Sequence, residues 1–293
     1  MGLGRWVFQG DSFVEAEAAS LSLFDRGFLF AHAAYEVTAV YNSQLIDFDL
    51  HMERLKRTLE AIEIEPLQED LRFLHEELLA RNGIEQGLVY VQVSAGNQGP
   101  RDFLGPDRLD PSLFMFATEK ALIGDNARDG VTAITMEDSR WRRRDLKTTQ
   151  LLSQSLAYRA ARRAGSFTAF MHEDGVVTEA ASANAWIVKE DSTLITRDLS
   201  PALLPGITRE RALTLLREHG HSVEERPFTL EEARSATEAF TTSTGAVILP
   251  ITHLDGAPVG KGAPGPVTRT VQRLYYEYIG VNTALVAPWV LSA

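Results

Sequence analysis

The sequence of 293 residues contains no cysteine. Disulfide bonds, thiolate metal centres and cysteine nucleophiles are therefore excluded, and covalent catalysis would need another side chain. The lack of disulfides fits a reducing compartment. No apolar run approaches the roughly 18 residues that a membrane-spanning helix requires, and the N-terminal stretch has no apolar core of signal-peptide length. We therefore expect a soluble, cytoplasmic protein with no membrane partner.

Positive charge is also scarce. The chain has 29 lysine and arginine residues against 40 aspartate and glutamate residues, which gives a formal net charge of -11. A protein that binds nucleic acid neutralises phosphates with a broad positive surface, and no long segment here is dominated by basic residues. We therefore expect no nucleic-acid partner. The apolar and charged fractions are ordinary for a globular protein with a substantial core.

The predicted strands and helices fall into two blocks, which indicates an α+β (α/β) fold in two domains. Residues 1–118 are predicted to form a small N-terminal α/β domain, and residues 130–293 a larger C-terminal domain. The polar, glycine-punctuated stretch 119–129 between them is predicted to be the linker. In the first block, Asp49 is predicted to cap one amphipathic helix, and Gly83 to end a second.

The second block begins with a strand that runs into an arginine cluster at 140–147. Either Thr148 or Thr149 is then predicted to open a helix that Gly165 ends. Two hairpins follow, the first with its turn at 173–175. No internal repeat or low-complexity segment interrupts this pattern.

The segment WRRRDLKTTQ raises the question of what Lys147 does behind three arginines. Arginine stays protonated at physiological pH, whereas lysine can lose its proton when burial or nearby cations disfavour the ammonium form. A neutral amine is a nucleophile, so Lys147 is a candidate Schiff-base lysine. Strand alternation would place it on one face with Trp141, Arg143 and Asp145, and Asp145 opposes the effect of the cations. Such a charge run is also typical of a solvated strand end, so both interpretations stay open.

Two turns in the second block suit an anion. In LLPGITRE, a Pro-Gly turn precedes a helix start at Ile207 and Thr208, whose free amides can bind phosphate. In FTTSTGAVILP, a strand runs into Ser243 and Thr244, which offer hydroxyls and exposed amides in one small turn. Taken alone, the first turn is more typical of an ordinary capped helix after a Pro-Gly turn, and the second is a common kind of Ser/Thr/Gly turn. Two such turns in one domain suit one phosphate approached from two sides.

Four further side chains are candidates. In VVTEAASANAWIV, Glu179 ends a strand among tiny residues, and a buried carboxylate there would need a partner such as a protonated heterocyclic nitrogen. A solvated turn glutamate fits the same pattern. Arg101, on a loop after a strand, could clamp a substrate carboxylate, and Arg54, on the first helix, could reach a phosphate. Both are also typical surface arginines, and His32 in FLFAHAAYEV is more typical of packing.

The order of these features favours pyridoxal 5′-phosphate. A lysine after a strand, then a carboxylate, then two hydroxyl-rich turns match what this cofactor requires. Lys147 would hold the aldehyde as a Schiff base, Glu179 would keep the pyridine nitrogen protonated, and the turns would anchor the phosphate.

The chain also resembles the fold-type IV pyridoxal-phosphate aminotransferases, and among them the D-amino acid aminotransferases. The resemblance covers nearly the whole length. It rests on FDRGFLFAHAAYEVTAVYN, HMERL, VYVQVSAGNQGPRDF, RWRRRDLKTTQ, VVTEAASANAWIV, LLPGITRE and FTTSTGAVILPI in this order. It implies a small N-terminal α/β domain, a larger barrel-like C-terminal domain, and a homodimer whose partner helps complete each active site.

The resemblance implies roles for individual residues as well. Lys147 matches the cofactor lysine, which also moves a proton between the substrate Cα and C4′ of the cofactor. Glu179 matches the partner of the pyridine nitrogen, and Arg140 matches an arginine near the cofactor. The family's phosphate-binding positions are matched by Arg54, Ile207, Thr208, Ser243 and Thr244, with Ile207 and Thr208 contributing backbone amides. Two members of the trap for the substrate carboxylate are matched by Tyr35 and Arg101.

The chain departs from the family pattern at three places. Ala31, His32 and Ala33 stand where GDG is common, Phe103 stands where the D-enzymes place a histidine, and Gly245 stands where threonine is frequent. The first two departures alter the substrate side, so His32 and Phe103 join the candidate substrate-binding residues. The segment FLFAHAAYEV also resembles the (R)-selective amine transaminases, which accept donors without a carboxylate.

We therefore predict an aminotransferase that moves the amino group of a D-amino acid, such as D-alanine, to 2-oxoglutarate or pyruvate. An (R)-selective amine transaminase is the first alternative. Aminodeoxychorismate lyase and branched-chain L-aminotransferase share the scaffold and are further alternatives. A phosphate-ligand binding protein without catalysis, in which Lys147 is only a counter-charge, is the alternative from another class.

Overall fold

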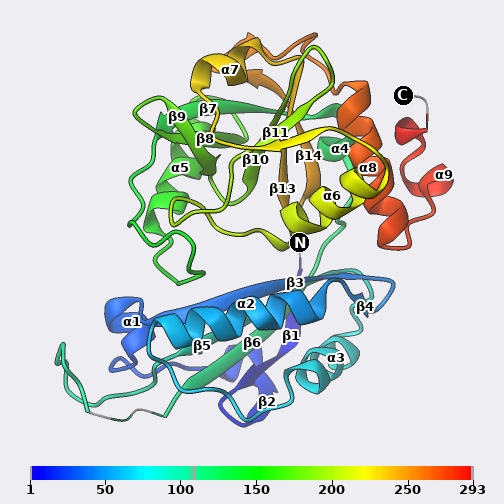
Figure 1. Cartoon of the computed structure of the whole chain (residues 1–293). Helices are drawn as coiled ribbons and strands as arrows, with labels where there is room; N and C mark the ends of the chain where they lie inside the picture. The colour runs from blue at the N-terminus through cyan, green and yellow to red at the C-terminus, as the bar shows by residue number, and fades with distance from the viewer. Residues whose placement is uncertain (1, 107, 109, 292–293) are drawn as a thin grey trace. The chain divides into compact units, whose positions relative to one another are not determined.

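The computed structural model describes residues 2–106, 108 and 110–291 (Figure 1). The chain divides into two compact units. Unit 1 consists of Met1–Leu122 with Leu146–Gln150, and unit 2 of Ile123–Asp145 with Leu151–Ala293. Lys147 thus belongs to unit 1, although longer segments before and after it belong to unit 2. In the described part of the chain, none of the helices combines the length and the apolar character that crossing a bilayer requires.

Unit 1 is built on a six-stranded antiparallel sheet in the order β2-β1-β6-β5-β3-β4. Its strands are β1 Gly2–Gln9, β2 Ser12–Glu15, β3 Ala33–Tyr41, β4 Gln44–Leu45, β5 Gly87–Ser94 and β6 Ser112–Glu119. Its helices are the short 3-10 turn η1 Ala16–Ala18, α1 Arg26–Phe30, α2 Phe48–Ala61 and α3 Leu71–Asn82. Leucines of α2 and α3 share one apolar core with alternate residues of the strands, so both helices pack on one face of the sheet (Figure 1).

The side chains of β3 alternate between the face of the sheet that packs against the helices and the opposite face. Successive side chains of a strand point to opposite faces, so Tyr35 and Glu36 diverge. Glu36 is fully buried on the side of α2. Tyr35, on the other face, stacks on Tyr90 of β5 with ring centroids 5.4 Å apart, and Tyr90 stacks in turn on Phe116 of β6 at 4.6 Å. The sheet therefore separates a buried charged site from an aromatic row.

Unit 2 contains a mixed nine-stranded sheet in the order β12-β11-β10-β13-β14-β7-β8-β9, with β15 paired to β14. Its strands are β7 Val131–Glu137, β8 Thr168–Glu173, β9 Val176–Ala180, β10 Asn184–Val188, β11 Leu194–Thr196, β12 Val223–Glu225, β13 Glu238–Ser243, β14 Val247–Leu254 and β15 Ala257–Pro258. A backbone bridge from Ala180 to Ala183 joins the end of β9 to the start of β10, so the sheet curls back on itself (Figure 1).

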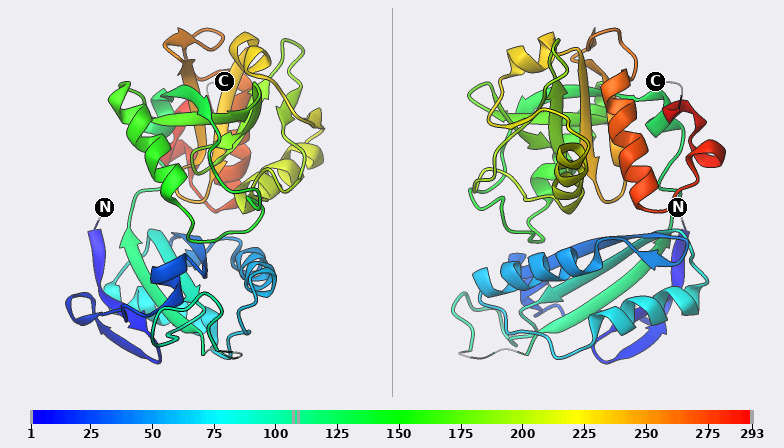
Figure 2. Two further views of the ribbon diagram at one scale, coloured as in Figure 1. Left: turned by 90° about the vertical axis from the view of Figure 1, so that its left-hand side faces the viewer. Right: turned by 45° about the vertical axis from the view of Figure 1, so that its right-hand side comes forward.

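The helices of unit 2 cover the curled sheet. They are α4 Asp125–Asp129, α5 Leu152–Arg163, α6 Ile207–Glu218, α7 Leu230–Ser235, α8 Pro266–Tyr278, α9 Thr283–Val286 and the 3-10 turn η2 Pro288–Val290. Helix α8, orange in Figures 1 and 2, packs against β13, β14 and α6. Trp186 of β10 is fully buried, stacks on Phe240, and donates from Nε1 to Thr242 Oγ1 at 3.1 Å. The predicted α+β fold class is confirmed.

Several predicted boundaries are confirmed. Gly83 is the left-handed residue that ends α3, and β8 and β9 form the predicted hairpin with Asp174 and Gly175 in its turn. The division between unit 1 and unit 2, between Leu122 and Ile123, falls within residues 119–129, and this stretch also contains α4. The predicted domain and linker bounds stay a prediction.

The prediction that a strand carries Lys147 is wrong. Strand β7 ends at Glu137, and residues 138–147 are irregular, so the expected shared face of Trp141, Arg143, Asp145 and Lys147 does not exist. The strand stops because Asp138 turns its own chain: its Oδ1 accepts from the N–H of Arg140 at 3.0 Å.

Two predicted helix starts are also wrong. Thr148 and Thr149 do not open α5, because they pair with β3 instead: Thr149 N–H donates to the Ala33 carbonyl at 3.1 Å, and Thr148 bridges Ala34. Helix α5 starts later, at Leu152. Asp49 does not cap α2 but lies in its first turn, since the flanking position is the left-handed Asp47.

Candidate active site

Lys147 lies in unit 1 beside the start of β3. Its carbonyl accepts from the N–H of Tyr35 at 3.0 Å, and its own N–H donates to Thr58 Oγ1 on α2 at 3.4 Å. The Nζ atom lies 4.4 Å from the centroid of the Tyr35 ring, and the side chain is half-buried. Two candidate residues far apart in the sequence, Lys147 and Tyr35, are therefore brought together, and Lys147 is not a fully solvated strand end.

Arg54 on α2 is buried, so it is not a surface arginine. Its Nε and Nη2 donate to the two carboxylate oxygens of Glu36 at 2.7 and 2.9 Å, which makes the pair bidentate. His51 Nδ1 lies 2.8 Å from the same carboxylate. Burial alone would raise the pKa of Glu36, but Arg54 and His51 outweigh it and hold that pKa well below its usual range. Arg54 is thus fixed as a cation inside unit 1, as a phosphate ligand requires.

Arg101, in contrast, is exposed on the loop between β5 and β6. Its guanidinium lies 4.6 Å from the ring centroid of Phe103 and 5.3 Å from that of Phe30. The two rings are themselves 5.3 Å apart, and Phe103 is 72% exposed. The candidate carboxylate-binding arginine therefore sits beside two phenyl rings, one of which replaces the histidine of the family pattern.

His32 contacts Arg26, which in turn holds the loop between β5 and β6. Arg26 donates from Nε to His32 Nδ1 at 3.1 Å, and it also donates to the carbonyls of Asp102 and Phe103, both at 3.2 Å. His32 Nε2 lies 2.7 Å from the carbonyl of Ile62. Since Nδ1 accepts from Arg26, Nε2 is the nitrogen that donates to Ile62, and His32 links Arg26 to the end of α2. Both of its polar atoms are engaged in structural contacts.

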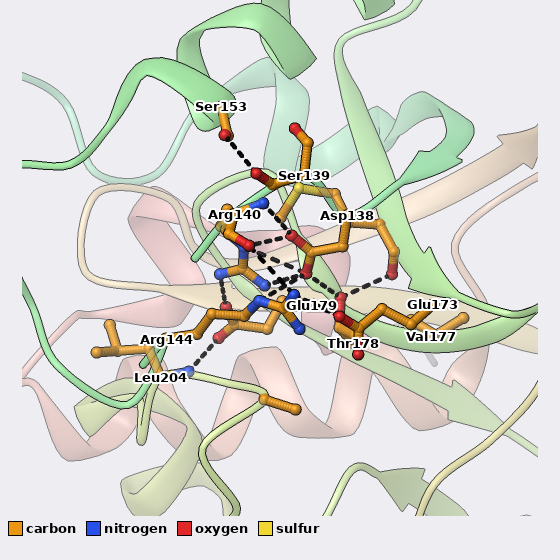
Figure 3. Close-up of polar contacts among 12 residues, drawn as sticks. Asp138, Ser139, Arg140, Arg144, Ser153, Glu173, Val177, Thr178, Glu179 and Leu204 are labelled. Atoms are coloured by element: carbon orange, nitrogen blue, oxygen red, sulfur yellow. Dashed lines mark hydrogen bonds and ion pairs between the residues drawn. The ribbon is translucent and has the colours of Figure 1, made fainter. Parts of the chain in front are cut away.

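Glu179 lies in unit 2, on β9, and is only 4% exposed, so it is not a solvated turn residue (Figure 3). Its Oε1 accepts from the N–H of Leu204 at 2.8 Å and from Asn184 Nδ2 at 3.0 Å. Its Oε2 accepts from Arg140 Nη1 in a close ion pair. Burial raises the pKa of Glu179, while the positive charge of Arg140 opposes that rise.

The arginine cluster extends this contact into a chain of alternating charges, drawn in Figure 3. Arg140 pairs with Glu179 and, at 2.7 Å, with Asp138. Arg144 lies 3.5 Å from Asp138 and pairs at 2.5 Å with Glu173, whose side chain reaches the surface. Three carboxylates thus share two guanidinium groups. The buried carboxylates of Asp138 and Glu179 thus explain two of the clustered arginines, Arg140 and Arg144.

The start of α6 is joined to Glu179 through Asn184. Asn184 Nδ2 donates to Glu179 and also to the carbonyl of Leu204, at 2.9 Å. A methyl group on Gly206 would lie 1.9 Å from Asn184 Oδ1, so only glycine fits there. Gly206 is the residue before α6 and has no side chain to cap the first amides, at Ile207 and Thr208. Those amides are thus available for an anion.

Ser243 and Thr244 stand at the tight connection of β13 to β14. Ser243 pairs with Val247 across the turn, and Ser243 and Thr244 are half-buried. Val247 has φ +54°, a left-handed conformation that a β-branched residue rarely adopts. A strained backbone persists only where the surrounding structure holds it in place. Such residues are found most often at active and ligand-binding sites. Helix α6 packs against β13, so the two predicted phosphate turns belong to neighbouring elements of one unit.

The residues of unit 2 fit the cationic ring of pyridoxal 5′-phosphate. A carboxylate has about four acceptor sites, and Leu204, Asn184 and Arg140 occupy three of those on Glu179. A protonated pyridine nitrogen would fill the fourth. Its positive charge would also be favoured beside the carboxylates of Glu179 and Asp138.

Comparison with known proteins identifies the family. The family model for amino-transferase class IV matches residues 33–254 of this chain. The chain therefore belongs to the class IV aminotransferases, which use pyridoxal 5′-phosphate, and the prediction of a pyridoxal-phosphate-dependent transaminase is confirmed.

The similar curated proteins include D-alanine aminotransferases of three bacteria. The protein from Listeria monocytogenes serotype 1/2a (strain 10403S) is 36% identical over 277 residues, covering 93% of this chain and 96% of its own. The protein from Bacillus licheniformis is 34% identical, covering 95% and 98%. That from Staphylococcus aureus (strain MSSA476) is 32% identical, covering 93% and 97%.

Solved structures with the same fold include branched-chain amino acid aminotransferases. The Escherichia coli enzyme superposes with a TM-score of 0.82 at 23% identity and covers 94% of both chains. The Thermoproteus uzoniensis enzyme, solved with norvaline, superposes with a TM-score of 0.82 at 26% identity and covers 98% of both. These likenesses confirm the predicted two-domain architecture of the fold-type IV enzymes and do not by themselves indicate the substrate.

Sequence reasoning missed four residues that organise the candidate site: Arg26, Glu36, Asp138 and Asn184. Glu36 was detectable in principle, because it occupies a core-facing position of β3 between Ala34 and Thr38, where a charge needs a partner. The other three were missed because their roles depend on side-chain contacts that only the folded chain makes, such as those of Asp138 with Thr178 and of Asn184 with the Leu204 carbonyl.

Proposed function

We propose that this chain is a pyridoxal-phosphate-dependent aminotransferase that transfers the amino group of a D-amino acid, such as D-alanine, to a 2-oxo acid. The observation that carries the proposal is the relationship to D-alanine aminotransferases, at 36% identity over 93% of the chain. The buried carboxylate of Glu179 supports it from the structure, because it can serve as the partner that the cofactor ring needs.

The cofactor supplies an aldehyde that takes up the amino group and a protonated ring that draws electrons from the breaking Cα–H bond. Lys147 supplies the amine that holds the aldehyde and, once released, moves a proton between Cα and C4′. Glu179 holds the ring nitrogen in its protonated form. Arg54, the amides of Ile207 and Thr208, and the turn at Ser243 and Thr244 bind the phosphate.

The substrate residues are Tyr35, Arg101, His32 and Phe103. Arg101 orients the carboxylate of the donor. Tyr35, whose ring centroid lies 4.4 Å from the Lys147 amine, lines the place where the amino group reacts. By aligning the Cα–H bond, these contacts use substrate binding energy to lower the activation barrier of proton removal. His32 contributes by holding Arg26, which anchors the loop of Arg101 and Phe103.

A second candidate function, transamination of (R)-amines, is favoured by one observation. Arg101 lies against the rings of Phe30 and Phe103, so an aryl group has an apolar surface beside the carboxylate site. A donor without a carboxylate, such as (R)-1-phenylethylamine, fits such a surface. We rank this activity second because the curated relatives reported above are D-alanine aminotransferases.

A cytoplasmic homodimer completes the proposal. Unit 1 exposes several large apolar side chains, among them Leu23, Phe28, Phe103 and Leu104, at 62–86%. A soluble monomer seldom leaves such a group uncovered, and a second copy of the chain would cover it. The lack of cysteine suits the reducing cytoplasm.

The test is a donor panel with the purified holoenzyme. Each D-amino acid, its L-isomer and a set of (R)-amines are paired with pyruvate and with 2-oxoglutarate, and the oxo acid or ketone product is measured. We expect D-alanine with 2-oxoglutarate to be among the best pairs and L-alanine to be inert. Faster turnover of L-leucine or L-valine than of any D-amino acid would contradict the proposal.

A further inference from the structure

We propose that Asp138 is a positioning residue that orients Arg140 through its Nε and Nη2 donors and keeps the buried cluster of Asp138, Arg140 and Glu179 negative toward the cofactor ring. The inference rests on the proposed function, since it takes Glu179 to face the pyridine nitrogen. No role for Asp138 follows from the motifs of the sequence, where it is only the residue after a strand.

Arg140 stands between two carboxylates but is not shared equally. Its Nε and Nη2 donate to Asp138 at 3.0 and 2.7 Å, and its backbone N–H donates to Asp138 Oδ1 at 3.0 Å. Glu179 receives only Nη1. The planar guanidinium is therefore oriented by Asp138, which takes its forked edge, while Glu179 meets a single N–H.

Asp138 is itself held in place. It is buried, and the hydroxyl of Thr178, the residue before Glu179 on β9, lies 2.6 Å from its Oδ2. Its backbone N–H donates to the carbonyl of His172 at 2.8 Å. Burial would raise the pKa of Asp138, but Arg140 and the hydroxyl of Thr178 hold that pKa below its usual value, so the group is a fixed anion.

The consequence for Glu179 is electrostatic. If Asp138 were neutral, the charge of Arg140 would be left to Glu179 alone, and the pair would be closer to neutral as seen from the ring. The loss of a buried anion nearby acts in the same direction. Both effects weaken the hold of Glu179 on a proton at the pyridine nitrogen, because a low-dielectric interior screens charges poorly. Asp138 thus sets how strongly the cofactor ring draws electrons, without contacting it.

The test uses holoenzyme loaded with pyridoxal 5′-phosphate that carries ¹⁵N in its ring, with Asp138→Asn as the variant. We expect the ¹⁵N resonance of the bound ring to move toward the value of an unprotonated pyridine. We also expect kcat for D-alanine to fall by up to about tenfold while KM is nearly unchanged, since one pKa unit changes the ratio of protonated to unprotonated ring tenfold. Glu137→Gln is the matched control, because it makes the same change in the adjacent, solvent-exposed side chain.

Thr178→Val is the second variant, which keeps the charge and the volume but removes the hydroxyl from Asp138. It should give a smaller ¹⁵N shift in the same direction, and it decides the matter if Asp138→Asn fails to fold. An unchanged ¹⁵N resonance in the folded variants, even with reduced kcat, would overturn the inference and assign Asp138 a structural role only. Failure of the wild-type protein to bind the labelled cofactor would instead overturn the proposed function.

Discussion

Glu36 grips Arg54 with both carboxylate oxygens, at 2.7 and 2.9 Å, beneath the strand that carries Tyr35. If Arg54 binds the cofactor phosphate, Glu36 is the residue that orients the Arg54 guanidinium toward that phosphate. We expect Glu36→Gln to weaken binding of pyridoxal 5′-phosphate far more than binding of pyridoxal, which lacks the phosphate. Removal of one partner from a buried pair also lowers the free energy of unfolding, by about 3–5 kcal/mol.

Fluorescence titration of the apoprotein with each cofactor form measures the two affinities, and urea unfolding measures the stability. Glu53→Gln serves as the control, because Glu53 is exposed on the same helix and should leave both quantities unchanged. Equal weakening of both cofactor forms by Glu36→Gln would show that Arg54 does not contact the phosphate.

Arg101 is expected to separate the two classes of donor. In Arg101→Ala, kcat/KM for D-alanine should fall by about 100-fold, because a bidentate, charge-assisted contact to the carboxylate is lost. The value for (R)-1-phenylethylamine should change little, since this amine has no carboxylate. Steady-state assays with both donors check the prediction, and Arg108→Ala, an exposed arginine of the same loop, is the control. A similar loss for the two donors would remove Arg101 from the carboxylate site.

The comparison of sequence and structure explains why some of these residues were predictable. Helical spacing, hairpin turns and glycine stops are local, so α3 with Gly83 and the hairpin of β8 and β9 follow from the sequence. The arrangement around Lys147 is not local. A strand was expected to continue to Lys147, but the side chain of Asp138 ends it, and the chain then pairs with β3.

The ion pairs of the site were beyond the local pattern for the same reason. Arg140 matched an arginine near the cofactor by resemblance alone. Of its two partners, Asp138 follows β7 and Glu179 lies on β9, and only the fold brings them together. Asn184 likewise reads as a plain strand residue, and its link between Glu179 and Leu204 depends on the position of a loop that lies 20 residues further along.

Ala31 offers a prediction about stability. It ends α1 with φ +53°, in the left-handed region that costs a residue with a Cβ atom about 1 kcal/mol relative to glycine. We therefore expect Ala31→Gly, which restores the first glycine of the family pattern, to raise the free energy of unfolding by about 1 kcal/mol. Ala33→Gly, in the extended and buried start of β3, should lower it instead. Urea unfolding of both variants provides the measurement, and a destabilising Ala31→Gly would contradict the reading of φ.

His75 gives unit 1 a defined response to acid. Burial lowers its pKa from 6.5 to about 4, so the folded protein keeps the imidazole neutral where the unfolded chain takes up a proton. Because the unfolded state binds more protons in this window, stability must fall as the pH drops from 6.5 toward 4, by about 1.4 kcal/mol per pH unit at most. Below that window the contribution is constant.

We expect His75→Gln to flatten this part of the stability profile, measured by urea unfolding at a series of pH values. His219→Gln is the matched control, since His219 makes a similar contact to the carbonyl four residues earlier but is exposed. A profile for His75→Gln that keeps the full wild-type slope between pH 6.5 and 4 would assign the acid sensitivity to other groups.

The central claim is that Lys147 is the residue that binds the cofactor aldehyde, and the chain is well suited to a direct test because it has only four other lysines: Lys56, Lys120, Lys189 and Lys261. Borohydride reduction of the holoenzyme, followed by proteolysis and mass spectrometry, locates the trapped cofactor. We predict that the phosphopyridoxyl mass appears on the peptide containing Lys147 and is absent from Lys147→Ala. Its appearance on another lysine, or on none, would contradict the account.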